Sequence, residues 1–247
     1  MLGVKGWGLK AEEGNGDLGV MKIVECFDLK KTYQQGKVIV HALQGINLEI
    51  EKGEFVALAG PSGSGKTTIL NLVGGLDVPD SGRIIVDGND YEKMNSTKLA
   101  DLRLYRIGFV FQSFNLIPVL SAIENVEYVM LLQKIPSKQR HEKAKNILDE
   151  VGLEGKYNRR PAELSGGQQQ RIAVARAIVS EPAIILADEP TANLDSKTGH
   201  GLLDIMKKMN ETKKITFIFS THDRMVMDYA KRIVLIRDGR VENDRKK

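Results

Sequence analysis

Short apolar runs recur along the chain and are separated by glycine-rich or charged segments. The runs at residues 55–59, 183–187 and 215–219 are continuous and of strand length, which is typical of strands that are buried on both faces. Between residues 113 and 163 the pattern changes, because the apolar residues from Ala144 to Val151 repeat at helical spacing with charges between them. The pattern therefore predicts an α/β fold with a largely parallel sheet and an inserted helical segment.

The N-terminal part is patterned differently. Residues 1–20 contain six glycines without periodicity, which predicts a flexible extension, and we expect the fold to begin at Met21. Residues 38–40, which are apolar, and residues 46–50, which alternate apolar and polar, predict two short strands on either side of a turn at residues 42–45.

Composition limits the classes of protein to which the chain can belong. A hydrophobic fraction of 42% and a charged fraction of 28% are typical of a globular protein. A single cysteine, Cys26, excludes an intrachain disulfide and a cysteine-built metal site. No stretch reaches the roughly 18 apolar residues of a spanning helix, so we expect any membrane role to depend on a partner. The net charge of +4 fits both a protein that handles polyphosphate and an ordinary solvated surface.

Residues 60–67 match the full phosphate-loop pattern G-x-x-x-x-G-K-[ST] and join a strand-length run to a helical pattern. Glycines let backbone N–H groups approach phosphate oxygens, Lys66 supplies an ammonium group, and Thr67 supplies a hydroxyl ligand for Mg²⁺. A chance glycine-rich turn is the alternative, and the flanking strand and helix argue against it. The predicted phosphate-binding residues are Gly60, Pro61, Ser62, Gly63, Ser64, Gly65, Lys66, Thr67 and Thr68.

Two adjacent carboxylates, Asp188 and Glu189, follow the apolar run 183–187. A Mg²⁺–phosphate site needs an acidic residue at the end of a buried strand, and neighbouring side chains there point in different directions. Asp188 is the predicted metal ligand, through water, and Glu189 is predicted to orient and polarise the attacking water. A solvated pair at the start of a loop is the alternative.

A second glycine-rich element, residues 164–168 with the sequence Leu-Ser-Gly-Gly-Gln, precedes a long helical pattern. Free N–H groups at the start of that helix would form a second anion site. Helix capping by Ser165 is the plainer interpretation, but capping alone does not require the glycine pair.

These motifs, together with Gln112, residues 192–195 (Ala-Asn-Leu-Asp) and His222, stand in the order found in one family. From about residue 21 to residue 242 the chain resembles the nucleotide-binding subunits of ABC transporters. The resemblance implies ATP as the nucleotide, Mg²⁺ as its metal ion and ATP hydrolysis as the reaction.

The resemblance also implies a role for each matching residue. Lys66 and His222 would contact the γ-phosphate, and His222 would also position Glu189. Gln112 would contact Mg²⁺ and the attacking water and would sense a membrane partner. Tyr33 would stack on adenine, with plain core filling as the alternative for this side chain.

Residues of the second glycine-rich element would act on ATP that a second copy of the chain holds. The resemblance therefore implies a homodimer that encloses two ATP molecules, in which Asp195 communicates across the interface. The residues predicted to act in this way are Ser165, Gly166, Gly167, Gln168 and Asp195.

We expect a division into parts that follows the motifs. Residues 21–112 and 168–242 would form the ATP-binding core, a RecA-like phosphate-loop NTPase core with an N-terminal antiparallel β subdomain. Residues 113–167 would form the inserted α-helical subdomain, and residues 243–247 a charged tail.

The expected partner is an integral membrane permease that docks near Gln112 and the helical subdomain, which would place the chain at the cytoplasmic face of the cell membrane as a peripheral subunit. An apolar stretch just after Gln112 would line the docking groove, with subdomain core as the alternative: Phe114, Leu116, Ile117, Pro118, Val119 and Leu120. No nucleic acid is expected, because no arginine-rich helix or basic stripe with interleaved aromatic residues is present in the sequence.

Within the family, residues 186–199 and 108–118 are similar to the lipoprotein-release and macrolide-export group. Ala192 departs from that group, which usually has glycine there. The ATPase subunit of a polar amino-acid importer is the second interpretation. A cytosolic ATPase of this family that acts as a regulator or on nucleic acid is the third.

Overall fold

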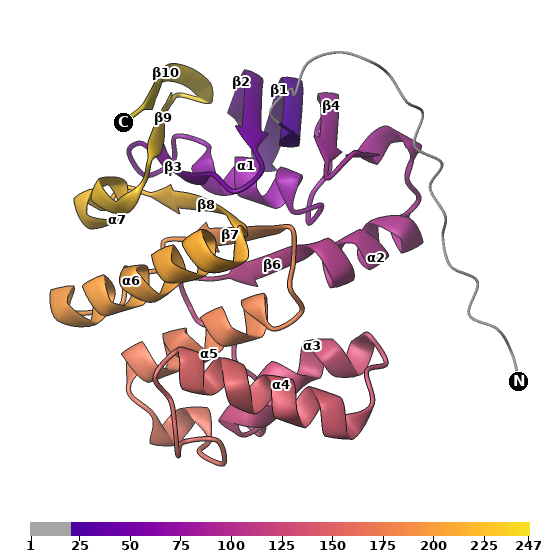
Figure 1. Ribbon diagram of the computed structural model, residues 1–247. Helices are drawn as coiled ribbons and strands as arrows, with labels where there is room; N and C mark the ends of the chain where they lie inside the picture. The colour runs from indigo at the N-terminus through magenta and orange to yellow at the C-terminus, as the bar shows by residue number, and fades with distance from the viewer. Residues whose placement is uncertain (1–20) are drawn as a thin grey trace, which may run out of the picture.

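The computed structural model describes residues 21–247 of the 247-residue chain. Residues 1–20, for which we predicted a flexible extension, lie outside the described residues. Figure 1 shows two sheets stacked above a group of helices.

The central sheet has six strands in the order β10-β9-β3-β8-β7-β6. All neighbours from β9 to β6 pair in parallel, and β10 pairs antiparallel to β9. Every residue of β3 and β8 is buried, as expected for parallel strands that are covered on both faces. The strands are β3 (Phe55–Ala59), β6 (Ile107–Val110), β7 (Ile184–Asp188), β8 (Thr216–Thr221), β9 (Arg232–Arg237) and β10 (Arg240–Lys246).

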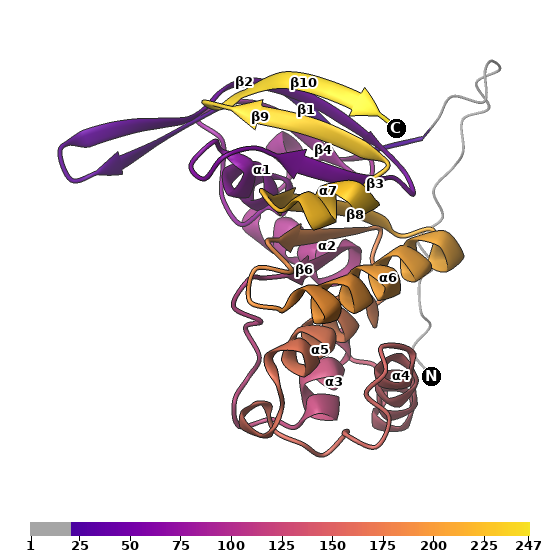
Figure 2. The ribbon, with the colours of Figure 1, turned by 90° about the vertical axis from the view of Figure 1, so that its left-hand side faces the viewer.

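The second sheet is antiparallel and has the order β2-β1-β4-β5. Its strands are β1 (Lys22–Gln35), β2 (Val38–Glu51), β4 (Ser81–Val86) and β5 (Asn89–Asp90). The long β1–β2 hairpin projects from the body of the molecule at the left of Figure 2.

The turn that we predicted at residues 42–45 is wrong. Strand β2 runs through this segment, with Leu43 paired to Lys31 and Gln44 to Lys30. Gly45 has a φ of +93°, and the β1–β2 register shifts close by. The turn-forming residues therefore produce a β-bulge within a continuous strand and do not end the strand.

Helices cover both faces of the central sheet. Helix α1 (Lys66–Val73) packs between the two sheets, while α5 (Gly166–Ile178) and α6 (Ser196–Lys213) share the apolar core on the opposite face with Phe55, Phe217 and Phe219. The remaining α-helices outside the helical subdomain are α2 (Ser96–Arg106) and α7 (Arg224–Tyr229). Short 3-10 turns occur at Tyr91–Lys93 and, within the helical subdomain, at Pro161–Glu163.

The helical subdomain lies at the bottom of Figure 1, away from the antiparallel sheet. Helices α3 (Ala122–Leu132) and α4 (Ser137–Glu150) pack on each other and on α5. The apolar residues predicted from helical spacing are buried there: Ala144, Ile147, Leu148 and Val151.

This architecture confirms the predicted fold class, with its parallel core, N-terminal antiparallel sheet and inserted helices. Residues 243–246, which we expected in a charged tail, instead belong to β10, where Asp244 pairs with Val234. The other boundaries that we assigned to the parts stay predictions. Among residues 21–247, no helix combines the length and the apolar character that crossing a bilayer requires.

Candidate functional site

The carboxyl ends of β3, β8 and β7 are neighbours in the central sheet, and each leads directly into a predicted motif. The phosphate loop follows β3, His222 follows β8, and Glu189 follows β7. Open parallel sheets bind ligands at this edge. The sheet order therefore brings together motifs that are far apart in the sequence.

The phosphate loop needs its glycine at position 65. Gly65 precedes α1 with a φ of +104°, and a Cβ there would lie 2.6 Å from the carbonyl oxygen of Ala42. Only glycine tolerates both the left-handed backbone and this contact. No side-chain hydrogen bond caps α1, so its first N–H groups are available to an anion.

Lys66 is buried inside the loop that precedes it. Its Nζ donates hydrogen bonds to the carbonyl oxygens of Gly60, at 2.9 Å, and Pro61, at 2.8 Å. Burial lowers the pKa of Lys66, and the carboxylates of Glu189 and Asp188 act in the opposite direction. A bound phosphate would further stabilise this partly desolvated ammonium group.

Oxygen ligands of the kind that Mg²⁺ prefers converge at the start of α1. The Thr67 hydroxyl donates to Asp188 Oδ1 at 3.1 Å, and Gln112 lines the same pocket. No group of three or more His, Cys, Asp or Glu side chains within residues 21–247 forms a protein-only metal site. The donor set fits an ion that is shared with phosphate oxygens and water, so Mg²⁺ at this position stays a prediction with suitable ligands.

Glu189 is held in an unusual conformation next to His222. Its φ is +45°, and its N–H donates to the carbonyl oxygen of Ser220 at 2.9 Å. Its carboxylate is hydrogen-bonded to His222 Nδ1 at 2.7 Å, and the Thr221 hydroxyl donates to it at 3.3 Å. Left-handed backbone at a non-glycine residue persists only where the surroundings enforce it. These contacts therefore fix the direction of one carboxylate while Asp188 faces Thr67.

Tyr33 lies on β1 at the rim of the same pocket. Its hydroxyl donates to Asp77 Oδ2 at 2.7 Å, and Lys31 Nζ lies 5.2 Å from its ring centroid. Burial and the hydrogen bond to Asp77 raise the pKa of Tyr33 to about 12, so the phenol stays neutral. The anchored hydroxyl fixes the ring at the pocket rim, where a base could stack on it.

The pocket that these residues surround has a volume of about 450 Å³. Most of the predicted residues line it, and Val40 and Ala42, which we did not predict, line it as well. Val40 pairs directly with Tyr33 across the hairpin, so the hairpin register would have indicated it. The lining residues are Tyr33, Val40, Ala42, Ser62, Gly63, Gly65, Lys66, Thr67, Thr68, Gln112, Asp188, Glu189 and His222.

The second glycine-rich element does not reach this pocket, since neither residues 165–168 nor Asp195 line it. Ser165 caps α5 in a capping box with Gln168, in agreement with the plainer interpretation. Position 167 also requires glycine, because a Cβ there would lie 2.2 Å from Thr198 Cγ2. The glycine thus lets the start of α5 approach the start of α6 closely.

Two contacts around Gln112 were not predicted from the sequence. Asn193 Nδ2 donates to the backbone carbonyl of Gln112 at 2.9 Å. Arg176 donates to the carbonyl oxygens of Asn115, at 2.6 Å, and Phe114, at 2.9 Å. Neither contact has a local sequence signal, because both join segments more than 60 positions apart (81 for Asn193, 61 and 62 for Arg176).

Comparisons with known proteins agree with this geometry. A family model described as ABC transporter matches residues 43–192. An ABC transporter ATP-binding protein of Thermotoga maritima is 47% identical over 221 residues, which cover 90% of this chain and 94% of that protein. The macrolide export ATP-binding/permease protein MacB of Syntrophobacter fumaroxidans is 45% identical, and the match covers 90% of this chain and 31% of MacB.

Solved structures give the same result. The cassette MJ0796 of Methanocaldococcus jannaschii, in a dimeric post-hydrolysis state bound to ADP and Pi, has a TM-score of 0.84 and 44% identity. That match covers 90% of this chain and 98% of the other. A second dimeric structure of the same cassette also has a TM-score of 0.84.

Proposed function

Because the chain belongs to the ABC transporter family and is an ATPase of that family, we propose that it drives a separate membrane permease of the lipoprotein-release or macrolide-export type. The similarity to MacB, which extends over 31% of the length of MacB, supports this subgroup over a polar amino-acid importer. In this proposal the chain is a peripheral subunit at the cytoplasmic face of the cell membrane.

The observation that carries the proposed mechanism is the separation of the two anion-binding elements. The pocket at the carboxyl edge of the sheet contains the phosphate loop, whereas Ser165 to Gln168 lie outside it. One chain can therefore surround ATP on one side only. A two-fold dimer would place the α5 N-terminus of each chain over the ATP of its partner. The dimeric cassettes of similar sequence support this arrangement.

Within the pocket, each side chain has a distinct part in hydrolysis. A water molecule attacks the γ-phosphorus of ATP, its proton passes to Glu189, and the bond to the bridging oxygen of ADP breaks. The contact with His222 keeps the Glu189 carboxylate turned toward that water, and Lys66 balances charge on the outer phosphates. Thr67, Gln112 and Asp188 would hold Mg²⁺, which neutralises phosphate charge when bound.

Substitutions of Tyr33 test whether the adenine of ATP stacks on this side chain. Replacing Tyr33 with Ala is expected to weaken ATP binding by about 5- to 150-fold, since stacking of a base on an aromatic ring contributes about 1–3 kcal/mol. Tyr33→Phe keeps the ring and loses only the hydrogen bond to Asp77, so it should stay within about threefold of wild type. Isothermal titration with ATP measures both. Equal affinities for the Ala variant and wild type would remove Tyr33 from the base site.

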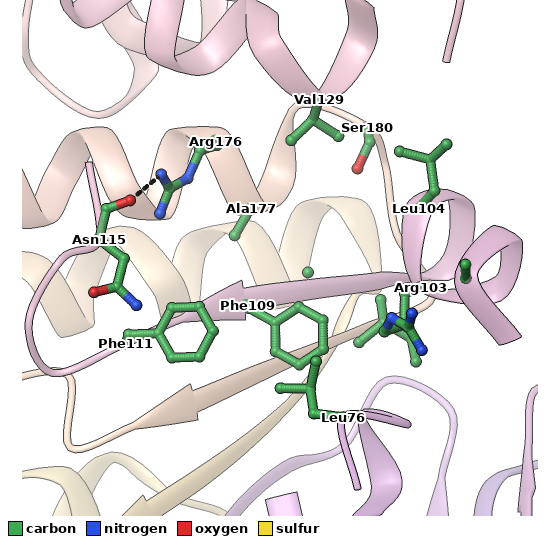
Figure 3. A pocket seen from close by; sticks show the side chains of 13 residues that line it. Leu76, Arg103, Leu104, Phe109, Phe111, Asn115, Val129, Arg176, Ala177 and Ser180 are labelled. Atoms are coloured by element: carbon green, nitrogen blue, oxygen red, sulfur yellow. Dashed lines mark hydrogen bonds between the residues drawn. The ribbon is translucent and has the colours of Figure 1, made fainter. Parts of the chain in front are cut away.

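A groove between the central sheet and the helical subdomain is the proposed docking site for the permease (Figure 3). Its volume is about 410 Å³, and it runs along β6 just before Gln112. Phe109 and Phe111 stack with parallel rings at 5.7 Å and line it. Our prediction for the groove lining was wrong, because none of the apolar residues that we expected there lines it: Phe114, Leu116, Ile117, Pro118, Val119 and Leu120. The Phe114 ring lies near Gly166 instead.

Leu76 offers a test of the permease partnership, because it lines the groove and is 49% exposed. Leu76→Lys should replace apolar surface of the groove with a charge without disturbing the core. Val78→Lys is the matched control, because Val78 is 66% exposed and does not line the groove. Affinity purification of the tagged chain from detergent-solubilised membranes should capture an integral membrane protein. We expect about a tenfold loss of that protein for Leu76→Lys alone.

Two other results would count against the proposed function. Capture of no membrane protein, even after crosslinking in the native membrane, would contradict it. Salt-sensitive binding of DNA in place of a membrane partner would favour the nucleic-acid alternative.

A further inference from the structure

A hydrogen bond joins the two segments that carry Glu189 and His222, although neither of its residues lines the nucleotide pocket. The Thr191 hydroxyl donates to Asp223 Oδ2 at 2.9 Å. Thr191 lies two residues after Glu189. Asp223 follows His222 directly. Thr191 is only 4% exposed, so its hydroxyl is shielded from water and depends on a protein acceptor.

The Asp223 carboxylate has a second partner. Its Oδ1 accepts a hydrogen bond from the backbone N–H of Met225 at 2.9 Å and so caps α7, which begins at Arg224. One oxygen of the carboxylate thus bonds the first turn of α7, and the other bonds the segment after β7. The carboxylate therefore connects these two parts of the fold at the residue next to His222.

Thr221 extends the network on the other side of His222. Its hydroxyl donates to Glu189 Oε2 at 3.3 Å and accepts the backbone N–H of Asp223 at 3.0 Å. Thr221 is fully buried, so its own position is fixed by packing. A closed ring results, in which Thr221 and Asp223 bridge the backbone of residues 189–191.

The imidazole of His222 depends on this ring because packing does not hold it. Its side chain is 64% exposed, whereas the Glu189 carboxylate, 2.7 Å from its Nδ1, is 14% exposed. An exposed ring keeps one position only if the backbone from which it projects is fixed by neighbouring contacts. Glu189 has the same requirement, because its left-handed backbone persists only where the surroundings enforce it.

Close packing against α6 directs the Thr191 hydroxyl. Gly199 of α6 lies against both segments, since a Cβ there would lie 3.1 Å from Met225 Sδ and 3.6 Å from Thr191 Cγ2. Threonine has two heavy atoms on its Cβ, so a contact that fixes the methyl group also fixes the direction of the hydroxyl. The side chain is therefore held in the rotamer that meets Asp223.

We propose that Thr191 and Asp223 are positioning residues for ATP hydrolysis. Their hydrogen bond keeps the His222 imidazole in contact with the Glu189 carboxylate. A displacement of about 1 Å at a reacting group can slow a reaction by about 100-fold. Loss of the bond should lower kcat and leave ATP affinity unchanged, because the phosphate loop lies outside the ring. The inference rests on the proposed role of Glu189 and adds the residues that set its direction.

Two substitutions of Thr191 test its hydroxyl. Thr191→Val has nearly the shape of threonine without the hydroxyl, so kcat should fall about tenfold while the Kd for ATP stays within about threefold of wild type. Thr191→Ser keeps the hydroxyl and should restore kcat to within about threefold. Thr212→Val, at an exposed position of α6 where the hydroxyl bonds the Lys208 carbonyl, is the matched control and should hydrolyse ATP normally. Steady-state hydrolysis and isothermal titration measure the two quantities.

Asp223→Ser separates the contact with Thr191 from the capping of α7. Serine is a good N-cap, so α7 should keep its first hydrogen bond, but the shorter side chain cannot also reach Thr191. We expect kcat to fall about tenfold here too, with no further fall when Thr191→Val is added, because both substitutions remove the same bond. Thermal unfolding within about 5 °C of wild type checks that the variants fold.

Glu189→Gln distinguishes failure of this inference from failure of the mechanism. If it stops hydrolysis while Thr191→Val and Asp223→Ser keep kcat within about threefold of wild type, the inference is overturned and the role of Glu189 stands. Losses of the two variants that multiply, or a matching loss of ATP affinity, would assign them a merely structural role and overturn it as well. Normal hydrolysis by Glu189→Gln would remove the proposed mechanism itself. These measurements use the full chain without a permease, so they are independent of the proposed partner.

Discussion

Replacing Glu189 with Gln is expected to stop ATP hydrolysis and to leave ATP binding intact. Glutamine has nearly the same shape and can still meet His222 and the Thr221 hydroxyl, so the left-handed backbone at position 189 should be kept. It cannot accept a proton from water. Loss of a general base typically reduces the rate by about 10²- to 10⁴-fold, so we expect kcat to decrease by a factor in that range. The Kd for ATP should change by less than about threefold.

The same variant should accumulate as a dimer. If each ATP is held between two chains, blocking hydrolysis keeps the γ-phosphate that joins them. Light scattering after size exclusion should show a dimer with MgATP and a monomer with MgADP. Glu211→Gln, which removes an exposed carboxylate from α6, is the matched control and should hydrolyse ATP normally. A strict monomer at high protein concentration with saturating ATP would count against the enclosed-nucleotide dimer.

The second large effect is the loss of ATP hydrolysis when either of the two anion-binding elements is altered, and the two substitutions should abolish hydrolysis for different reasons. Lys66→Ala removes the ammonium group that the loop encloses, so this chain should lose its own ATP site. Ser165→Arg leaves the 450 Å³ pocket intact, since Ser165 does not line it, but places a bulky side chain at the start of α5. Each variant alone should hydrolyse ATP at under about 1% of the wild-type rate, and only Ser165→Arg should still bind ATP as a monomer.

Much of the site could be predicted because its motifs are local. Residues 60–67 connect β3 to the first turn of α1, so adjacent residues of the sequence show the order strand, glycine loop and helix. Asp188 and Glu189 likewise come directly after the continuous apolar residues of β7, with Asp188 as the last residue of that strand. That these segments meet at one edge follows from parallel pairing of β3, β8 and β7, since parallel strands end on the same side.

The features that escaped prediction depend on contacts between distant segments. Pairing with β1 outweighs the turn-forming tendency of residues 42–45. The polar residues 243–246 form a strand because they pair with the edge of β9. In the sequence, Arg176 is one more basic residue of a helical segment. Only the folded chain brings it into contact with Phe114 and Asn115. Propensity and motif spacing contain no information about such pairings.

The most direct test of the central claim, that each ATP is bound between two chains, is to mix the two inactive variants. A Lys66→Ala chain keeps an intact α5 N-terminus, and a Ser165→Arg chain keeps an intact phosphate loop. A mixed dimer thus has one complete site and one with both defects. At equal concentrations half of the dimers are mixed, so ATPase activity should return to about a quarter of the wild-type rate per chain. A mixture no more active than the two variants measured separately would contradict the claim.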